Sequence, residues 1–352
     1  MIMNLIEDLK TLIRIPSFSG EEDRAADWIS GQLKEAGVPM ERLKNNVWAR
    51  NFHFDKAKPT VLLNSHLDTV KPGESWTYDP FSAETIDGKL IGLGANDAGA
   101  SLICLLNTFL CFYKIALPFN LIFCASAEEE NSGENGMEWV RNHLGKIDFA
   151  IVGEPTNCEL AVAEKGLLVI DAVATGKTGH AARNNGENAI YIALNDIQKL
   201  KLVEFTVPSE MLGNVNLNVT QITAGTQHNV IPDKCRFTID VRSTDSYSND
   251  EILAILQSYC VSELTARSTR LMPSGLPLGH PIFSVAKKLG IPCFGSPTMS
   301  DQALMPWPSI KTGPGFSERS HTADEYILLS ELEQGKTHYM NLIKALCNET
   351  LG

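Results

Sequence analysis

The sequence predicts an α/β fold interrupted by a smaller α+β domain of the ferredoxin-like type. Strand-like and helix-like segments alternate over residues 1–165 and again over residues 275–352, whereas residues 166–274 follow the order β-α-β-β-α-β. The length of 352 residues is too great for one ordinary core and suits two domains. We therefore expect one domain built from residues 1–165 and 275–352, with the second inserted at residues 166–274.

The elements of the first segment are predicted from apolar periodicity and from helix start and stop signals. The helix predicted at residues 21–36 begins with acidic residues and ends at Gly37, because glycine commonly terminates a helix. A buried strand is predicted at residues 59–63, shortly ahead of His66. The other expected elements are helices at residues 5–13, 100–113 and 136–144 and strands at residues 47–52, 90–93, 120–127 and 149–152.

The inserted segment is predicted from strands in which apolar and polar residues alternate strictly. Residues 215–220 and 235–241 both show this pattern, which is typical of a sheet with one polar face. Pro273 and Pro277 then punctuate the chain before helix–strand alternation resumes. The remaining expected elements are strands at residues 167–174, 263–271, 291–294 and 309–311 and helices at residues 187–202, 249–260, 281–289 and 328–347.

Composition and charge argue against several classes of function. The net charge is −12, whereas nucleic-acid binding requires a basic face. The first residues lack a basic segment followed by an apolar run, and polar residues interrupt the most apolar stretch, residues 102–123. We therefore expect neither a signal peptide nor a membrane span. The eight cysteines are scattered without a Cys-x-x-Cys pair, which is typical of free thiols in a reducing compartment, and we expect a cytoplasmic location.

His66 and Asp68 follow the buried strand predicted at residues 59–63. Residues two apart on an extended backbone point to the same side, and ligands of α/β sheets bind outside the carboxyl ends of the strands. The pair fits a metal ligand with an acidic neighbour, a base with its orienting carboxylate, or an ordinary polar strand end. The other strand ends are needed to choose among these alternatives.

Acidic residues and a second histidine close other strands of the same domain. Two histidines with several carboxylates form a hard, oxygen-rich set that suits two metal ions sharing a carboxylate. In this hypothesis each ion takes one histidine and one terminal carboxylate, Asp97 bridges the ions, and one acid of the triplet at residues 128–130 is the general base. Asp68 then orients His66. The residues of this constellation are His66, Asp68, Asp97, Glu128, Glu129, Glu130, Glu154 and His321.

Seven short motifs are distributed in order along essentially the whole chain. They are SHLDTV at residues 65–70, GAND at 94–97, EE at 129–130, GEPT at 153–156, GHAA at 179–182, NVIP at 229–232 and SHTADE at 320–325. Together they resemble the zinc aminoacylase/carboxypeptidase family, which includes acetylornithine deacetylase and succinyl-diaminopimelate desuccinylase. The resemblance implies a zinc-peptidase-like, three-layer catalytic domain with an inserted ferredoxin-like dimerisation domain. One departure is Ala98-Gly99-Ala100, where the family often has a bulky residue and then lysine or threonine.

The resemblance also implies a role for each residue of the constellation. Asp97 would bridge two Zn²⁺ ions, for which Co²⁺ or Mn²⁺ are alternatives, and the peptide bond after it would be cis. Glu129 would be the general base and acid, and Asp68 the carboxylate behind His66. If the frame of the triplet shifts by one residue, Glu128 becomes the base and Glu129 the ligand; we favour the later pair. The implied metal ligands are His66, Asp97, Glu130, Glu154 and His321.

Further site residues are implied outside this cluster. The resemblance implies that His180 reaches the active site of the partner subunit in a homodimer and stabilises an oxyanion, although a loop histidine that caps the next helix is an alternative. Asn229 and Arg242 resemble substrate-contact positions. Arg242 has the planar fork that binds carboxylates, but an exposed strand arginine is also common. Gly313 belongs to a backbone cradle for a substrate carboxylate or to a simple turn.

These features predict an enzyme that hydrolyses the amide bond of a small N-acylated amino acid. A deacetylase acting on acetylornithine or acetylcitrulline is favoured, because the GEPT motif around Glu154 resembles the deacylases. A succinyl-amino-acid desuccinylase and a di- or tripeptidase on the same scaffold are the alternatives. A non-catalytic member that binds an amino-acid derivative or a partner belongs to another class, and the complete ligand set argues against it.

Overall fold

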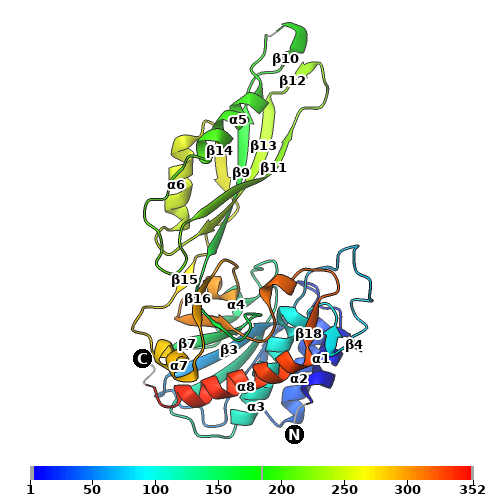
Figure 1. Ribbon diagram of the computed structural model, residues 1–352, viewed down its shortest axis with the longest axis vertical. Coiled ribbons are helices and arrows are strands. Elements are labelled where there is room, and N and C mark those ends of the chain that lie inside the picture. Colours follow the sequence, from blue (N-terminus) through cyan, green and yellow to red (C-terminus); the bar gives the residue numbers. More distant parts are fainter. Residues whose placement is uncertain (1–3, 184, 350–352) are drawn as a thin grey trace. The chain divides into compact units, whose positions relative to one another are not determined.

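A computed structural model describes residues 4–183 and 185–349 of the protein. The chain forms two compact units. The first comprises Met1–Val162, Gly275–Phe294 and Ser300–Gly352, and the second comprises Ala163–Ser274 and Gly295–Met299. Each unit has a sheet with its own helices (Figure 1), so the α/β class with an additional α+β sheet is confirmed.

The central sheet is built on parallel strands of the first unit, and three of its shorter strands cross the unit boundary in sequence. Its strands are β1 (Met40–Leu43), β2 (Asn46–Arg50), β3 (Thr60–His66), β6 (Asn120–Ser126), β7 (Phe149–Gly153), β8 (Leu160–Glu164), β15 (Ser274–Gly275), β16 (Cys293–Ser296) and β17 (Ser309–Thr312). The order is β1-β2-β6-β3-β7-β17-β8-β15, with β16 beside β8, and β6, β3, β7 and β17 run parallel. β3 and β6 are buried along their whole length, and such strands form continuous apolar runs.

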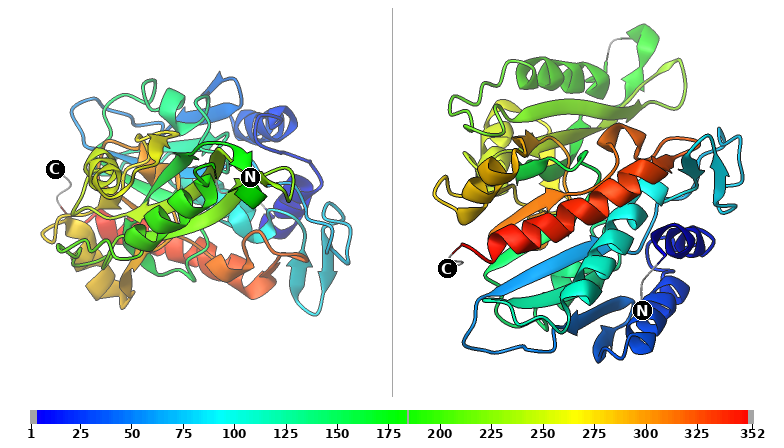
Figure 2. Two further views of the ribbon diagram at one scale, coloured as in Figure 1. Left: turned by 90° about the horizontal axis from the view of Figure 1, so that it is seen from above. Right: turned by 60° about the horizontal axis from the view of Figure 1, so that its bottom comes forward.

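Six helices accompany this sheet in the described part of the first unit. They are α1 (Leu5–Ile13), α2 (Asp23–Glu35), α3 (Ala100–Phe112), α4 (Met137–Val140), α7 (Pro281–Leu289) and α8 (Leu329–Leu346). α3 and α8 pack side by side (Figure 2), and α1 contacts both. The segment Ala95–Phe112 is long and apolar enough to cross a membrane, yet 83% of it is buried inside the protein. Burial on all sides is typical of a core helix, which α3 is.

The second unit is a four-stranded antiparallel sheet with two helices. Its elements are β9 (Gly166–Thr175), β10 (Gly179–His180), α5 (Ala189–Leu200), β11 (Asn216–Ala224), β12 (Val230–Ile231), β13 (Lys234–Ser243), α6 (Asn249–Tyr259) and β14 (Glu263–Ala266). The main sheet has the order β11-β13-β9-β14, and β10 pairs with β12. Buried and more exposed residues alternate along β9 and β13, because the helices cover one face of the sheet (Figure 1).

Several short elements differ from the prediction. The helix expected at residues 136–144 is only α4, and the strand expected at residues 263–271 ends at Ala266. Four short strands were not expected: β1, β4 (Glu84–Ile86), β8 and β18 (Tyr326–Leu328). Of these, β4 and β18 form a sheet with β5 (Lys89–Ile91). Such short strands contain too few residues for a period of two to be recognised. The remaining turns are η1 (Ala95–Gly99), η2 (Ala181–Arg183), η3 (Asp301–Leu304) and η4 (Ser317–Arg319).

Candidate metal centre

Three parallel strands of the first unit end beside one another at one edge of the central sheet. His66 is the last residue of β3, the acidic triplet at residues 128–130 follows β6, and Glu154 follows β7. Asp97 lies in η1 ahead of α3, and His321 follows η4. Because parallel strands end at the same edge, residues far apart in sequence converge there, which is where α/β sheets bind their ligands.

His66 is buried, and both nitrogens of its imidazole have oxygen partners. Nδ1 lies 2.9 Å from the backbone carbonyl oxygen of Asp68 and 3.5 Å from its carboxylate Oδ1. Both oxygens only accept hydrogen bonds, so Nδ1 is the donor, and Nε2 faces Asp97 Oδ1 at 3.2 Å. Burial is the largest effect and lowers the pKa of His66. The hydrogen bonds with Asp68 and Asp97 outweigh it and hold that pKa well above its ordinary value, so the surroundings favour a positive charge.

Asp97 presents one carboxylate oxygen to each of two histidines. Its Oδ1 lies 3.2 Å from His66 Nε2, and its Oδ2 lies 3.6 Å from His321 Nε2. The peptide bond between Asp97 and Ala98 is cis, as the family resemblance implies. A carboxylate whose oxygens face different imidazoles has the orientation required to bridge two ions.

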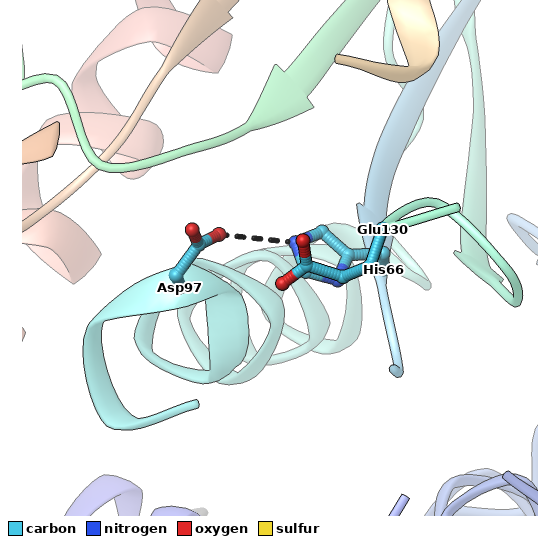
Figure 3. Close-up of side chains that lie close together, drawn as sticks. All are labelled: His66, Asp97 and Glu130. Atoms are coloured by element: carbon cyan, nitrogen blue, oxygen red, sulfur yellow. Dashed lines mark hydrogen bonds and ion pairs between the residues drawn. The ribbon is translucent and has the colours of Figure 1, made fainter. Parts of the chain in front are cut away.

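His321 and Glu130 form the other side of the cluster. His321 Nε2 lies 2.9 Å from Glu130 Oε2, and this hydrogen bond is the largest cause that raises the pKa of His321 to about 9. The side chain of His321 is 54% exposed, whereas that of His66 is 1% exposed. Figure 3 shows that His66, Asp97 and Glu130 point toward one another, and their ligand atoms all lie within 4.8 Å, close enough to hold a metal ion.

Glu154 gives a direct test of whether a cation fits this cluster. Its Oε1 is buried, lies 3.9 Å from His66 Nε2 and accepts no hydrogen bond from the residues that the structure describes. Burial first, and then the charge of Asp97, raise the pKa of Glu154 to about 8. A buried carboxylate oxygen without a donor is costly unless a cation binds it. The donor set of imidazole nitrogens and carboxylate oxygens therefore fits divalent metal ions, Zn²⁺ included.

The three glutamates after β6 have different environments. Glu128 accepts hydrogen bonds from the side-chain amide of Asn135, at 2.9 Å from its Oε1. Glu130 is the partner of His321. The Glu129 carboxylate accepts no hydrogen bond from the described residues, and burial, the largest effect, raises its pKa well above the ordinary value. This arrangement agrees with the frame in which Glu130 is the ligand and Glu129 the base.

The Asp68 carboxylate contacts His66 and also accepts hydrogen bonds from the acidic turn after β6. The backbone N–H groups of Glu129 and Glu130 donate to its two oxygens at 3.0 Å each, and the Ser19 hydroxyl donates at 2.6 Å. Asp68 is 1% exposed, and these donors together with His66 lower its pKa despite burial, which is the largest single effect and raises it. One buried carboxylate thus fixes both the strand end and the acidic turn.

Comparison with known proteins places this geometry in a family. The sequence profile described as Peptidase family M20/M25/M40 matches residues 62–345. The chain belongs to this family. It is therefore an enzyme, a metallohydrolase, and the relationship indicated by the seven motifs is confirmed.

Individual relatives of this M20 chain include both deacylases and peptidases. It is 26% identical to the acetylornithine deacetylase of Buchnera aphidicola subsp. Schizaphis graminum, over 98% of this chain and 99% of that protein. It is 30% identical to the succinyl-diaminopimelate desuccinylase of Methylorubrum populi, over 68% of each. Among solved structures, the dinuclear metal-binding M20 peptidase YXEP of Bacillus subtilis superposes with a TM-score of 0.75 at 17% identity, covering 97% of each chain, which supports the fold.

His180 and Asn229 of the M20 chain lie on neighbouring backbone segments of the second unit. His180 pairs with Val230 across β10 and β12, and the Ala181 N–H donates to the Asn229 carbonyl oxygen at 3.0 Å. The Ala182 N–H donates to His180 Nδ1 at 3.1 Å at the start of the short turn η2. The next helix, α5, has Asn188 as its N-cap, so His180 does not cap that helix. Because Nδ1 accepts, the neutral ring carries its hydrogen on Nε2, and the side chain is exposed.

The structure does not bring Arg242 to the same end of the second unit. Arg242 is eight positions beyond Lys234 on β13, or about 26 Å along an extended strand, whereas His180 and Asn229 lie before that strand begins. Its guanidinium forms two hydrogen bonds with Asp240, at 2.9 and 3.1 Å. Its fork is thus already paired with a carboxylate of the same strand.

Gly313 lies in the first unit beside the metal cluster and is tightly enclosed. Its N–H donates to Thr156 Oγ1 at 3.1 Å, so this donor of the expected cradle already has a partner. A Cβ atom at Gly313 would lie 2.3 Å from Ser101 Oγ and 2.7 Å from the backbone oxygen of Glu154. The position therefore requires glycine because the backbone passes close to the Glu154 segment.

Two buried acids beside the cluster were not among the predicted site residues. Asp301 accepts a 2.6 Å hydrogen bond from the Ser126 hydroxyl at the end of β6, and burial raises its pKa to about 6. Glu325 accepts hydrogen bonds from the backbone of η1 and the glycine before it. Glu325 closes the SHTADE motif, which is a usable sequence signal, whereas Asp301 lies in a loop that offers none.

Proposed function

We propose that this M20 chain hydrolyses the amide bond of an N-acylated amino acid with an acetyl-type acyl group. The main support for this proposal is the difference between two adjacent acids. Glu130 pairs with His321, whereas Glu129 has a raised pKa and no such partner among the described residues. An acid next to a metal cluster but outside its ligand set can move protons. Relatedness to an acetylornithine deacetylase over 98% of the chain supports the acetyl-type substrate.

Two sets of side chains would hold the cations, Zn²⁺ in this proposal. One set is His66, Asp97 and Glu154, and the other is Asp97, Glu130 and His321. When bound, the two cations supply the Lewis acidity that lowers the pKa of water and polarises the amide carbonyl. Glu129 accepts a proton from the attacking water and returns it to the leaving nitrogen. Its raised pKa suits this role, because the carboxyl group must keep the proton between the two steps.

We also propose that the chain forms a homodimer through the second unit, so that His180 donates its Nε2–H to the oxyanion in the partner's site. Tyr191 and Leu194 on α5 are 70% and 45% exposed, and Ile222 on the edge strand β11 is 52% exposed. Exposed apolar side chains on an edge strand and a nearby helix favour association. Sedimentation should find a dimer that Ile222→Glu dissociates; a wild-type monomer would contradict the proposal.

The cytoplasm is the proposed location of this enzyme. All eight cysteines are free thiols, and Cys104, Cys124 and Cys235 are buried. Free thiols persist in reducing compartments, where disulfides are rare. Fractionation of cells that produce the full-length protein should recover it with cytoplasmic markers.

The general base is tested with a matched pair of isosteric variants. Glu129→Gln should lower kcat by about 10²–10⁴-fold while two metal ions per chain are retained, because the amide cannot take up the proton. Glu128→Gln is the control and should retain wild-type turnover, since Glu128 contacts Asn135 instead. Normal turnover in Glu129→Gln would contradict the assignment, and loss of turnover only in Glu128→Gln would support the shifted frame.

The acyl group is tested with a substrate panel. It contains the acetyl and succinyl derivatives of ornithine, citrulline, lysine and diaminopimelate, together with dipeptides, each assayed with added Zn²⁺ or Co²⁺. The highest kcat/KM is expected for an acetylated amino acid. The 30% identity to a desuccinylase makes succinylated substrates the second candidate, and a preference for these or for dipeptides would replace the acetyl assignment.

A further inference from the structure

A buried carboxylate holds the backbone that carries Asp97. Glu325 is 2% exposed and accepts hydrogen bonds from three N–H groups of this backbone. Its Oε1 accepts from the N–H groups of Asn96 and Asp97 at 2.8 and 2.9 Å, and its Oε2 accepts from the Gly94 N–H at 3.1 Å. Burial excludes the water that would otherwise compete for these hydrogen bonds. The position of Asp97 is therefore tied to the position of Glu325.

A side-chain amide makes the reciprocal connection. Asn96 is fully buried, and its Nδ2 donates to the Phe316 carbonyl oxygen at 3.0 Å and lies 3.4 Å from Ser320 Oγ. Its Oδ1 accepts from the Phe316 N–H at 3.0 Å. Phe316 and Ser320 precede His321 in the same loop. Asn96 and Glu325 thus join the loop that carries His321 to the turn that carries Asp97. Asn96 contacts the loop before His321, and Glu325 is itself part of the loop after His321.

His321 depends on this connection more than His66 does. The His66 side chain is 1% exposed at the end of a central strand, whereas the His321 side chain is 54% exposed and its backbone has a positive φ of 61°. An exposed loop residue has few packing contacts of its own to fix it. The 3.6 Å separation between His321 Nε2 and Asp97 Oδ2 is therefore set by how the two backbone segments are joined.

We propose that Glu325 and Asn96 are positioning residues that fix His321 relative to Asp97 and thereby govern metal affinity on the His321 side of the centre. This inference rests on the proposed two-metal function. The His321 half-site is defined as Asp97, Glu130 and His321, and the His66 half-site as His66, Asp97 and Glu154. Partners that orient metal ligands commonly change metal affinity by about 10–100-fold when removed. Both half-sites include Asp97, but only the His321 half-site also includes a ligand on the exposed loop, so the larger loss of affinity is expected there.

The test is a titration of the metal-free full-length chain with Co²⁺, followed by calorimetry and by the absorption spectrum of the bound ion. His321→Ala identifies which of two binding steps belongs to the His321 half-site. In that step, Asn96→Ala and Glu325→Gln should weaken affinity by about 10–100-fold, with a smaller change in the other step. Asp196→Asn is the matched control, since Asp196 is a buried carboxylate that accepts backbone N–H groups in the second unit.

The outcomes separate this inference from the proposed function. A wild-type chain that binds fewer than two ions contradicts the two-metal function. In a chain that binds two, wild-type affinity in folded Asn96→Ala contradicts the positioning role, and so does equal weakening of both steps. Weakening of the same size in Asp196→Asn would show a general loss of stability instead. If Glu325→Gln does not fold by circular dichroism, Asn96→Ala, which keeps the buried carboxylate, decides the question.

Discussion

His66 and His321 occupy similar places in the candidate metal centre but very different places in the fold. His66 ends a buried strand, and its Nδ1 is bonded to the backbone two residues later. His321 lies in a loop with its side chain 54% exposed, and its position depends on hydrogen bonds that other residues make. Two candidate ligands of the same type are thus held in different ways. The central sheet holds His66, whereas hydrogen bonds between two loops hold His321. Stability and metal affinity should therefore respond separately to variants of the two histidines.

Asp97→Asn should have the largest effect, because Asp97 belongs to both the His66 half-site and the His321 half-site. An amide has one oxygen in place of two and carries no charge, so it cannot serve both half-sites as the carboxylate does. We expect metal content to fall from two ions per chain toward none and kcat/KM to fall by at least about 10³-fold. Metal analysis after dialysis measures the first and steady-state kinetics the second. Asp87→Asn in the exposed β4–β5 turn is the control, and full metal content in Asp97→Asn would refute the shared-ligand role.

His66→Ala and His321→Ala test the comparison directly. Each should remove one ion and most of the activity, but only His66→Ala should destabilise the metal-free chain. Removing a buried, bonded imidazole costs about 1–3 kcal/mol, whereas an exposed substitution usually changes stability by less than about 0.5 kcal/mol. Denaturant unfolding of the metal-free variants measures this difference. Equal destabilisation by the two substitutions would show that the loop is as rigid as the strand.

Asp68→Asn should have a smaller effect on metal affinity than Asp97→Asn. Asp68 faces His66 and also accepts the backbone N–H groups of Glu129 and Glu130. The amide oxygen can replace only part of these contacts, so we expect metal affinity to fall by about 10–100-fold with the ligand set intact. Competition with a chromophoric chelator measures this change. Unchanged affinity would mean that the Asp68 backbone carbonyl alone orients His66.

His338 sharpens the comparison because it is buried like His66 but lies beside a hydroxyl instead of carboxylates. Its Nε2 is 2.8 Å from Thr312 Oγ1, and burial lowers its pKa from 6.5 to about 4. The unfolded chain therefore binds the proton more readily between these values. The contribution of His338 to unfolding free energy is complete above pH 6.5 and is lost as the pH falls toward 4.

His338→Gln should reduce this pH dependence. The expected reduction in the change of unfolding free energy between pH 7 and pH 4.5 is about 2–3 kcal/mol relative to the wild type. Urea unfolding of the metal-free chains at the two pH values measures it. Identical pH dependence in the variant and the wild type would show that burial does not suppress protonation of this histidine.

Much of the fold could be predicted from the sequence because its long elements have strong periodic patterns. The helix predicted at residues 5–13 is α1 as expected, and the alternating residues 235–241 lie in β13. The short strands β4 and β18 escaped prediction because they are specified by pairing with β5, and pairing partners are not visible in a local pattern.

The sequence by itself determined the α/β class, the order of the motifs and the family, because periodicity and motif order are properties of the chain. It also located the candidate acids and histidines at the ends of predicted strands. Only the tertiary structure decided that Glu130 and not Glu129 lies beside His321, and that Asp97 faces both imidazoles. It alone revealed that Glu325 and Asn96 join the loops that carry Asp97 and His321. These facts depend on side-chain direction and on contacts between residues 31 to 229 positions apart, and three-dimensional packing sets both.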